Sequence, residues 1–464
     1  MRASIVTAVA GGLALALAAC TDSETSAGPS QEPVDRPPEL SVVTFGVTTL
    51  GNPADNSGAQ AINELGQVLL TLGPEPYRPW VWTNGSLLAL LHPFDAHGVQ
   101  GFDLNANAVS VGDVDGQAAA WVNGELTMLQ VPAGVLGSQA LAINDAGQIV
   151  GTASLPGDVN NSPVIWQNKD QEMTVLPGGV GRAVDINNAG EIVGASLDEG
   201  QNFIRGAYWA SATAEPQFLK GPTGQPCGEP DAINDRSEMV GFCGNGAAYW
   251  SGPTANAVAL GSGTSGATGI NELGQIVGLS RIEGSFDFHP TLWQQEGTAF
   301  RAFDLGIVSG YTEGQVHDVN NHGQAVGSTL KDFTILGLLW QIPVRVAMDV
   351  VPGAVSSIKL GGTGNVAAAL LGSPWFHAGD IDPNTLTLGN DNGTETPIAR
   401  KKNSPVAKLT DVNRDGDLDL VVEFPKQAMT KTGDLVAGSQ VLVVQGRLRD
   451  GTRLRGADQV TGVR

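Results

Sequence analysis

Short apolar runs alternate with polar, glycine-containing turns along most of this chain, and one combination of run and turn recurs. A clear copy is Ile143–Gly151, where the turn Asn-Asp-Ala-Gly at residues 144–147 separates an apolar run from a β-branched one. Asparagine at the first position of a type I turn, and glycine at the fourth, where the backbone needs a positive φ, are typical of a β-hairpin. The pattern therefore predicts a hairpin here.

The same turn recurs at intervals that suit one structural unit. The second residue of the repeated stretch, which is the first residue of the turn, is a marker asparagine, found at Asn63, Asn105, Asn144, Asn187, Asn234, Asn271 and Asn320, with separations of 42, 39, 43, 47, 37 and 49 residues. Each repeat also contains a tryptophan at a similar distance after the asparagine: Trp82, Trp121, Trp166, Trp209, Trp250, Trp293 and Trp340. Two further strand-like segments follow each hairpin, so a repeat of about 43 residues holds four short strands.

A four-stranded sheet cannot bury both faces alone, so neighbouring repeats must stack against one another. Four-stranded units in roughly four to eight copies are typical of a β-propeller. We therefore predict an all-β fold with a seven-bladed β-propeller over residues 41–343. A β-solenoid is the alternative, although its coils are usually shorter, at roughly 20–30 residues. The tryptophans are expected to pack between blades as core residues.

Three features bear on how the repeats close and vary. The strand-like run Ser41–Leu50 precedes the first hairpin, and we predict that it completes the last blade and closes the ring, which removes exposed sheet edges. Ala108 and Ser237 replace the turn glycine in the second and fifth repeats, where we expect a local backbone cost. Cys227 and Cys243 lie eight residues on either side of the fifth turn, which predicts a disulfide in an exported protein.

The first forty residues have the composition of a sorting signal and a tether. An apolar run from Ile5 to Leu17 is too short to span a bilayer and is typical of a signal-peptide core. The following Leu-Ala-Ala-Cys closely resembles the lipobox of bacterial lipoproteins, which implies that residues 1–20 are a lipoprotein signal, that Cys20 is lipidated and that the lipid anchors the protein to a membrane. An ordinary signal cleaved nearby is the alternative. Residues 21–40 are expected to form a disordered tether.

By resemblance to lipoprotein sorting patterns, an aspartate directly after the lipidated cysteine would favour retention at the inner membrane. This chain has Thr21 there, with Asp22 one residue later. We therefore expect a location in the bacterial cell envelope, at the outer membrane or the cell surface.

The repeats resemble the bacterial extracellular repeats named HAF. Those units follow an Ile-Asn-x-x-Gly-x-Ile-Val-Gly pattern, then a strand like His-Ala-Phe-x-Trp, then Leu-Gly. The match extends over residues 41–343, but the second motif is eroded, since Gly206–Trp209 and His289–Trp293 each keep only part of it. The resemblance implies a secreted repeat domain, without an assigned reaction.

The period stops at residue 344, where irregularly spaced strand-like segments begin, so residues 344–464 predict a small β-sandwich-like domain. Asp382–Leu386 and Asp411–Val422 resemble, in that order, two segments of a β-rich module that ends many secreted bacterial proteins. In the second segment, oxygen ligands at alternate positions precede a glycine, as in the first half of an EF-hand loop. A structural calcium ion is therefore predicted, with an acidic surface turn as the alternative. The expected ligands are Asp411, Asn413, Asp415, Asp417 and Asp419.

Charge and motifs narrow the possible functions. A formal net charge of −22 argues against nucleic acid as a partner. A basic group near the end is expected to form the solvated face of a strand, with an anion site as the alternative; it comprises Arg447, Arg449, Arg453 and Arg455. The chain contains no nucleophile elbow, phosphate loop or dinucleotide fingerprint.

Four carboxylates directly follow marker asparagines: Glu64, Asp145, Asp235 and Glu272. In a propeller, such residues could form an acid pair for glycoside hydrolysis. Their repeated turn position favours solvated turn residues instead. Two functions remain. The favoured one is a non-catalytic envelope lipoprotein whose propeller binds a glycan, peptide or protein; the other is a polysaccharide-active hydrolase or lyase on the same scaffold.

Overall fold

The computed structural model describes residues 41–463, except for 43–44, 52–55, 74–77, 158–159, 201–202, 245, 262, 282–286, 297–298, 333 and 354–355. Within this part, helical structure is limited to α1 (Lys426–Thr432) and the 3-10 turn η3 (Ala378–Asp380). The prediction of an all-β fold is therefore confirmed. The predicted signal, the lipidation site Cys20 and the tether lie outside the described residues. No helix in the described ranges is long and apolar enough to cross a bilayer.

Residues 46–341 contain seven four-stranded antiparallel sheets in the part that the structure describes. The first strands are β3 (Gly58–Ile62), β7 (Val99–Leu104), β11 (Gly137–Ile143), β15 (Gly181–Ile186), β19 (Pro230–Ile233), β23 (Ser265–Ile270) and β27 (Glu313–Val319). The second strands are β4 (Val68–Leu72), β8 (Val109–Val114), β12 (Ile149–Ser154), β16 (Ile192–Asp198), β20 (Met239–Cys243), β24 (Gln275–Arg281) and β28 (Gln324–Lys331).

The marker turn joins the first strand of each sheet to the second, as predicted. The third strands are β5 (Arg78–Thr83), β9 (Gln117–Val122), β13 (Ser162–Trp166), β17 (Phe203–Trp209), β21 (Gly246–Trp250), β25 (Phe288–Glu296) and β29 (Thr334–Gln341). The fourth strands are β6 (Ser86–Ala89), β10 (Glu125–Met128), β14 (Thr174–Val175), β18 (Gln217–Phe218), β22 (Val258–Ala259), β26 (Ala299–Asp304) and β2 (Gly46–Leu50).

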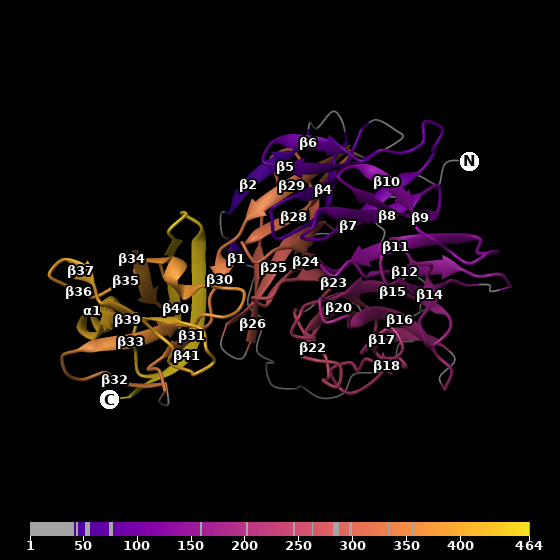
Figure 1. Ribbon diagram of the computed structural model, residues 1–464. Coiled ribbons are helices and arrows are strands. Elements are labelled where there is room, and N and C mark those ends of the chain that lie inside the picture. Colours follow the sequence, from indigo (N-terminus) through magenta and orange to yellow (C-terminus); the bar gives the residue numbers. More distant parts are fainter. Residues whose placement is uncertain are drawn as a thin grey trace, which may run out of the picture. The chain divides into compact units, whose positions relative to one another are not determined.

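The strand β2 comes from the beginning of the repeat region, yet it pairs antiparallel with β29 at its end (Figure 1). The run expected to form one strand over residues 41–50 is split, because β1 (Ser41–Val42) pairs in parallel with β26 in the preceding sheet. Each second strand contacts the first strand of the next sheet, and β28 likewise contacts β3. Radially repeated four-stranded meanders with this contact pattern form a β-propeller.

The marker turn has the geometry that its sequence predicts. In the third repeat, the backbone N–H of Gly147 donates to Asn144 O (3.0 Å), that of Asn144 donates to Gln148 O (3.0 Å), and Gly147 has φ = 82°. Ala108 and Ser237 adopt the same left-handed conformation, with φ of 58° and 59°. The turn is therefore kept where the glycine is lost.

The marker asparagines link the repeats to one another. Asn144 illustrates the pattern: its Oδ1 accepts a hydrogen bond from the backbone N–H of Gln148 (2.9 Å), while its Nδ2 donates to Asn187 O (3.0 Å) in the next repeat. All seven asparagines donate in this way over 2.9–3.1 Å, and Asn320 donates back to Asn63 O. We call this closed circuit the asparagine ring. Its members are 2–5% exposed, so it is an internal structural feature.

Six of the seven tryptophans are completely buried, and Trp82 is half-buried. The indole Nε1 of Trp121 donates to Leu91 O (2.7 Å), and that of Trp166 donates to Gln130 O (2.8 Å), in each case just after the fourth strand of the preceding sheet. The expectation that the tryptophans are core residues is confirmed for these six. Their ring N–H groups also join adjacent sheets.

Residues 344–463 form a six-stranded sheet and a four-stranded sheet around a core of buried apolar residues that also includes Leu273 of the propeller. The first sheet contains β30 (Val344–Arg345), β41 (Arg453–Val463), β40 (Gly438–Leu448), β34 (Ile381–Gly389) and β35 (Thr396–Pro397), and β32 (Ser357–Lys359) also pairs with β41. The second contains β31 (Met348–Val350), β33 (Asn365–Leu370), β39 (Asp419–Pro425) and β38 (Ala407–Thr410), beside the small hairpin of β36 (Arg400–Lys401) and β37 (Ser404–Pro405).

Candidate functional site

Among the four turn carboxylates considered for acid catalysis, burial and the nearby charge of Asp235 raise the pKa of Glu272 to about 7. Each of the four accepts a hydrogen bond from a backbone N–H in an adjacent repeat: Asn321 to Glu64 (3.1 Å), Ala106 to Asp145 (2.8 Å), Asn188 to Asp235 (2.7 Å) and Asp235 to Glu272 (2.8 Å). They are therefore more than solvated turn residues. They hold successive turns together.

Three other acids, which the sequence interpretation missed, have a similar structural role. Asp103 accepts hydrogen bonds from the backbone N–H of Leu104 (2.7 Å) and from that of Ile143 in the next repeat (2.8 Å). Asp185 and Asp318 bridge their own and the following repeat in the same way. Each lies two residues before a marker asparagine, where the other repeats have alanine or glycine. An aspartate in place of this small residue was the sequence feature that could have identified them.

Burial changes the titration of these acids. It raises the pKa of Asp103 to about 8, that of Asp185 to about 7 and that of Asp318 to about 6. The charges of Asp185 and Asp318 add to the rise at Asp103, which shows that these carboxyl groups influence one another from three different repeats. Acids on the first strands therefore favour their protonated form more than exposed acids do.

Two further titratable groups occupy the first strands. Burial raises the pKa of Asp231 to about 8 and lowers that of His317 to about 4. Beside Asp231, Glu229 forms an ion pair with Arg182 (2.6 Å). His317 contacts Gln315 through its Nε2 (3.1 Å). No hydrogen bond joins Asp231 to His317 in the described structure, so they do not form an acid–base pair.

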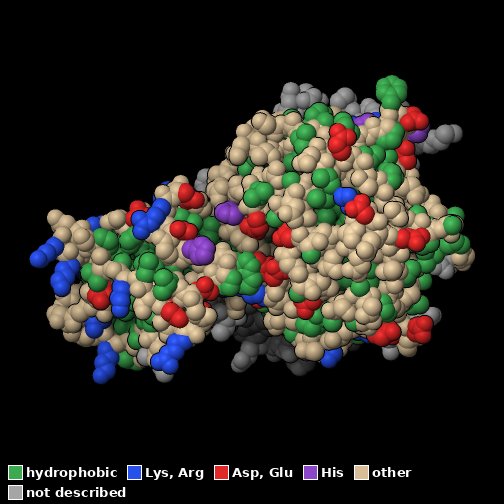
Figure 2. Space-filling view, in the orientation of Figure 1, with side chains coloured by type: hydrophobic (Ala, Val, Ile, Leu, Met, Phe, Trp, Pro, Cys, Tyr) green, Lys and Arg blue, Asp and Glu red, His purple; other side chains and the backbone are tan. Residues whose placement is uncertain are grey.

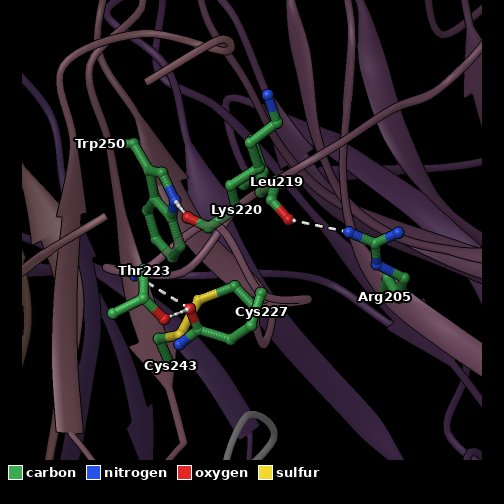
Figure 3. Close-up of a disulfide and its surroundings, with 8 residues drawn as sticks. Arg205, Leu219, Lys220, Thr223, Cys227, Cys243 and Trp250 are labelled. Atoms are coloured by element: carbon green, nitrogen blue, oxygen red, sulfur yellow. Dashed lines mark hydrogen bonds between the residues drawn. A yellow bond between two sulfur atoms is a disulfide. The ribbon is translucent and has the colours of Figure 1, made fainter. Parts of the chain in front are cut away.

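The predicted disulfide is present. Cys227, before β19, and Cys243, at the end of β20, are bonded with an S–S distance of 2.03 Å (Figure 3). The same view shows the indole of Trp250 donating to Lys220 O (2.8 Å). The bridge therefore fastens the segment entering the fifth sheet to the second strand of that sheet.

The predicted calcium loop contains oxygen ligands of the expected types, but several of its carboxylates accept hydrogen bonds from backbone N–H groups. Asp419 is completely buried, and its carboxylate accepts hydrogen bonds from the backbone N–H of Gly372 (2.9 Å) and Val412 (2.7 Å). Asp411 accepts from the backbone N–H of Arg414 (2.6 Å) and Gly416 (3.2 Å). Among the described residues, no three Asp, Glu, His or Cys side chains converge as a metal site.

These contacts assign Asp411 and Asp419 to holding the loop in shape. Three of the predicted ligands, Asn413, Asp415 and Asp417, remain on the outer part of the loop, where Asn413 Nδ2 donates to Asp415 Oδ2 (2.6 Å). Carboxylate and amide oxygens are ligands that calcium prefers. The calcium ion stays a prediction.

A cavity of about 380 Å³ opens between the propeller strands β25 and β26 and the C-terminal strands β34, β40 and β41. We call it the junction pocket. It is lined by Phe45, Leu292, Gln294, Phe303, Pro343, Thr385, Thr387, Asp391, Gln445, Gly446, Arg447, Arg453, Leu454 and Arg455. Eight of these fourteen residues are polar or charged, and they lie beside five apolar side chains.

One side of the junction pocket is a network of two arginines and two carboxylates. Arg455 binds Glu296 (2.6 Å) and Asp391 (3.0 Å), and Arg301 binds Asp391 (2.9 Å). Burial opposes ionisation of Asp391, but its hydrogen bonds and ion pairs with the two arginines outweigh burial and lower its pKa. Both guanidinium groups also lie over the ring of Phe303. This network joins the propeller to the C-terminal sheet.

The basic group expected to form a solvated strand face is divided by this arrangement. Arg455 is ion-paired inside the junction, so the expectation was wrong for that residue. Arg449 is exposed and donates to Gly379 O (3.2 Å). Arg447 and Arg453 are exposed at the pocket. In Figure 2, most Lys and Arg side chains in view lie over the C-terminal elements.

No family model matches the sequence, and no curated protein is found to be related to it. Among solved structures, a puromycin-hydrolysing peptidase of Mycobacterium tuberculosis is similar, with a TM-score of 0.42, 12% identity, and coverage of 66% of this chain and 53% of the peptidase. YCF48 bound to D1 peptide has a TM-score of 0.41 and 11% identity, covering 65% and 98% of the two chains.

XC5397, a gluconolactonase of Xanthomonas campestris, has a TM-score of 0.36 and 14% identity, with coverage of 69% of this chain and 99% of the lactonase. The chain spans about half the length of the peptidase. These similarities are distant. The β-propeller assignment rests on the strand pairing and sheet contacts described above.

Proposed function

We propose that this protein is a non-catalytic lipoprotein of the bacterial cell envelope that binds a ligand in the junction pocket. The observation that carries the proposal is the side chain of Gln294, which is 3% exposed and lines the pocket, with no hydrogen-bond partner for its Nε2. A buried donor without a partner is costly, so a ligand that enters the pocket and supplies an acceptor to Gln294 would remove this cost.

The scaffold of the proposal is a closed seven-bladed propeller followed by a separate C-terminal β domain over residues 344–464. The asparagine ring and the β2–β29 pairing support closure, and an apolar core that takes all its buried members except Leu273 from residues 344–464 supports the second domain. The HAF-like repeats and the lipobox ending at Cys20 support export and anchoring. A calcium ion at the Asp411–Asp419 loop would order that loop and take no part in chemistry.

The hydrogen bonds of the acids favour binding over hydrolysis. The candidates for a catalytic pair each accept a hydrogen bond from the backbone of a neighbouring repeat: Glu64, Asp145, Asp235 and Glu272. A polysaccharide-active hydrolase or lyase is the competing function, and product analysis separates it from a binding protein.

The test uses the full chain purified in detergent, together with a Cys20→Ser variant. The proposal expects the wild type in the membrane fraction and the variant released from it. The purified protein is then incubated with envelope glycans, and any retained glycan is analysed for chain length. Retention of intact glycan supports the proposal, whereas shortened or unsaturated products, or no retention of any envelope component, would overturn it.

A further inference from the structure

We propose that the ligand of the junction pocket is an acidic saccharide of one or two uronate residues. Arg453 and Arg447 hold its carboxylate, and Gln294 and Thr387 bind its hydroxyl groups. This inference rests on the proposed function and specifies the ligand class for the same site.

The first argument is the charge left over at the pocket. The network of Arg301, Arg455, Glu296 and Asp391 contains two cations and two anions that compensate one another. Asp391, the carboxylate in the pocket lining, also accepts a hydrogen bond from Gln445 Nε2 (2.7 Å), so its oxygens are fully engaged. The remaining charged groups of the pocket lining are two arginines, and an anion is therefore attracted there.

The second argument is the hydrogen-bonding capacity of those two arginines. Arg453 has no hydrogen bond or ion pair with any described residue, and Arg447 donates from its side chain to Gly451 O alone (2.8 Å). They lie opposite each other, since Arg447 on β40 pairs with Arg453 on β41. A planar guanidinium can bind a carboxylate through two parallel hydrogen bonds.

The third argument is the orphan amide of Gln294, which directly follows Trp293. The last repeat has glutamine at the same place, and there Gln341 Nε2 donates to His322 O (3.0 Å) and Gly323 O (3.1 Å). At Gln294 the equivalent donor has no partner. Thr387 also has no side-chain hydrogen bond in the described structure. An amide donor and a hydroxyl at one pocket match the alternating donor and acceptor groups of a sugar.

The strand pairing argues against a peptide as the ligand. At the pocket, β25 is paired on both sides at Leu292 and Gln294, β40 at Gln445 and Arg447, and β41 at Leu454 and Arg455, while Gly446 and Arg453 are paired on one side. Most of these backbone groups are used, so little free strand edge is left to which an extended peptide could add. Recognition must come from side chains.

Size and lining argue against a small inorganic anion. Ligand sites have volumes of roughly 300–1,000 Å³, and a cavity of about 380 Å³ accommodates one or two sugar rings. Pro343 in the pocket lining is half-buried and supplies apolar surface that would face the C–H groups of a pyranose ring. A phosphate ion would leave this surface without a partner.

The experiment measures binding by calorimetry with three acidic disaccharides of different stereochemistry: digalacturonate, dimannuronate and a glucuronate-containing disaccharide. Neutral galactobiose and inorganic phosphate are the comparison ligands. At least one acidic disaccharide is expected to bind the full-length protein, with galactobiose at least about tenfold weaker, because charge-assisted hydrogen bonds are lost.

Two variants locate the site. Arg453→Ala is expected to weaken binding at least about tenfold, while Arg449→Ala, which removes the same charge outside the pocket lining, leaves affinity unchanged. Gln294→Leu is expected to weaken binding as well, yet to leave the melting temperature of the ligand-free protein unchanged or higher, because it removes a buried donor without a partner. A purely structural Gln294 would show the reverse, namely lower stability and unchanged affinity.

Several outcomes would overturn the inference: equal binding of galactobiose, binding of phosphate alone, affinity that is unaffected by Arg453→Ala, or no binding of any acidic disaccharide. If envelope components are still retained in these cases, the proposed function stands and only the ligand class or its location is wrong. If nothing is retained, both fail.

Discussion

The propeller and the C-terminal region differ in charge and in whether their polar side chains have hydrogen-bond partners. Residues 41–343 contain nine Lys and Arg against 29 Asp and Glu, whereas residues 344–464 contain 14 against 13. Despite its acidity, the propeller engages many of its carboxylates and amides in bonds between repeats, as the asparagine ring and Asp103 show. The C-terminal region supplies Arg453, which has no partner in the described structure.

This difference shows where binding groups arise in a repeat protein. A repeated polar residue meets a copy of the same partner in every neighbour, so its hydrogen bonds are satisfied by symmetry. Where a repeat contacts the non-repeating residues 344–464, the neighbour no longer supplies the same hydrogen-bond partner. Gln294 loses the carbonyl partners that Gln341 keeps, and the junction pocket lies at this point.

The largest effect is expected from removal of the disulfide. The cysteines of the bridge are 16 residues apart, and replacing both Cys227 and Cys243 with serine should lower stability by about 3 kcal/mol on the chain-entropy model. Calorimetric melting of the double variant, with oxidised and reduced wild type for reference, measures the loss. An unchanged melting temperature would show that the fifth repeat does not depend on the bridge.

Breaking the asparagine ring should have the next largest effect. Asn187→Ala leaves the backbone N–H groups of Ala189 and Glu191 and the carbonyl of Asn234 without their side-chain partner. Because Asn187 and its partner carbonyl on Asn234 are buried while the other two groups are more accessible, the unfolding free energy should fall by about 2 kcal/mol. The matched change in the C-terminal region is Asn413→Ala, in an exposed loop, which should cost less than about 0.5 kcal/mol. Equal losses in denaturant titrations would contradict the comparison.

The partly buried acids of the first strands predict a pH dependence of the propeller. Burial raises the pKa of Asp103 to about 8, above the ordinary value of 3.8, so the folded state holds this proton more tightly than the unfolded state. The contribution to stability is fully present below pH 3.8 and is lost as pH rises through about 8. The melting temperature of Asp103→Asn should therefore fall less than that of wild type between pH 5 and pH 9.

The control for this pH dependence is Asp170→Asn, since the Asp170 side chain is 71% exposed. This variant should keep the wild-type slope. If Asp103→Asn also keeps the wild-type slope, the partly buried acids do not govern the pH dependence.

Calcium should produce the smallest change, confined to the C-terminal region. At a calcium concentration ten times its dissociation constant, binding would stabilise the folded protein by about 1.4 kcal/mol. The rise in melting temperature should disappear on chelation and in Asp415→Asn, and it should persist in the exposed Asp450→Asn. A wild-type protein that melts identically in calcium and in chelator would remove calcium from the proposal.

The sequence was informative where a structural feature depends on local chain geometry. The turn at residues 144–147 was predicted because its fourth position requires a positive φ, which glycine adopts without strain. The burial of the tryptophans and the Cys227–Cys243 bridge followed from periodicity and spacing. The sequence did not predict that Asp103 links two repeats, because its second hydrogen-bond partner, Ile143, belongs to the next repeat.

By itself, the sequence determined the repeating unit, its all-β character and the residues that would recur inside it, since these depend on period, turn chemistry and hydrophobicity. Only the tertiary structure decided which polar groups are left without partners. Gln294, Thr387 and Arg453 come from distant parts of the chain, and a hydrogen bond depends on distance in space. The junction pocket therefore could not be predicted from the sequence, because it forms only where the last propeller sheets pack against the C-terminal sheet.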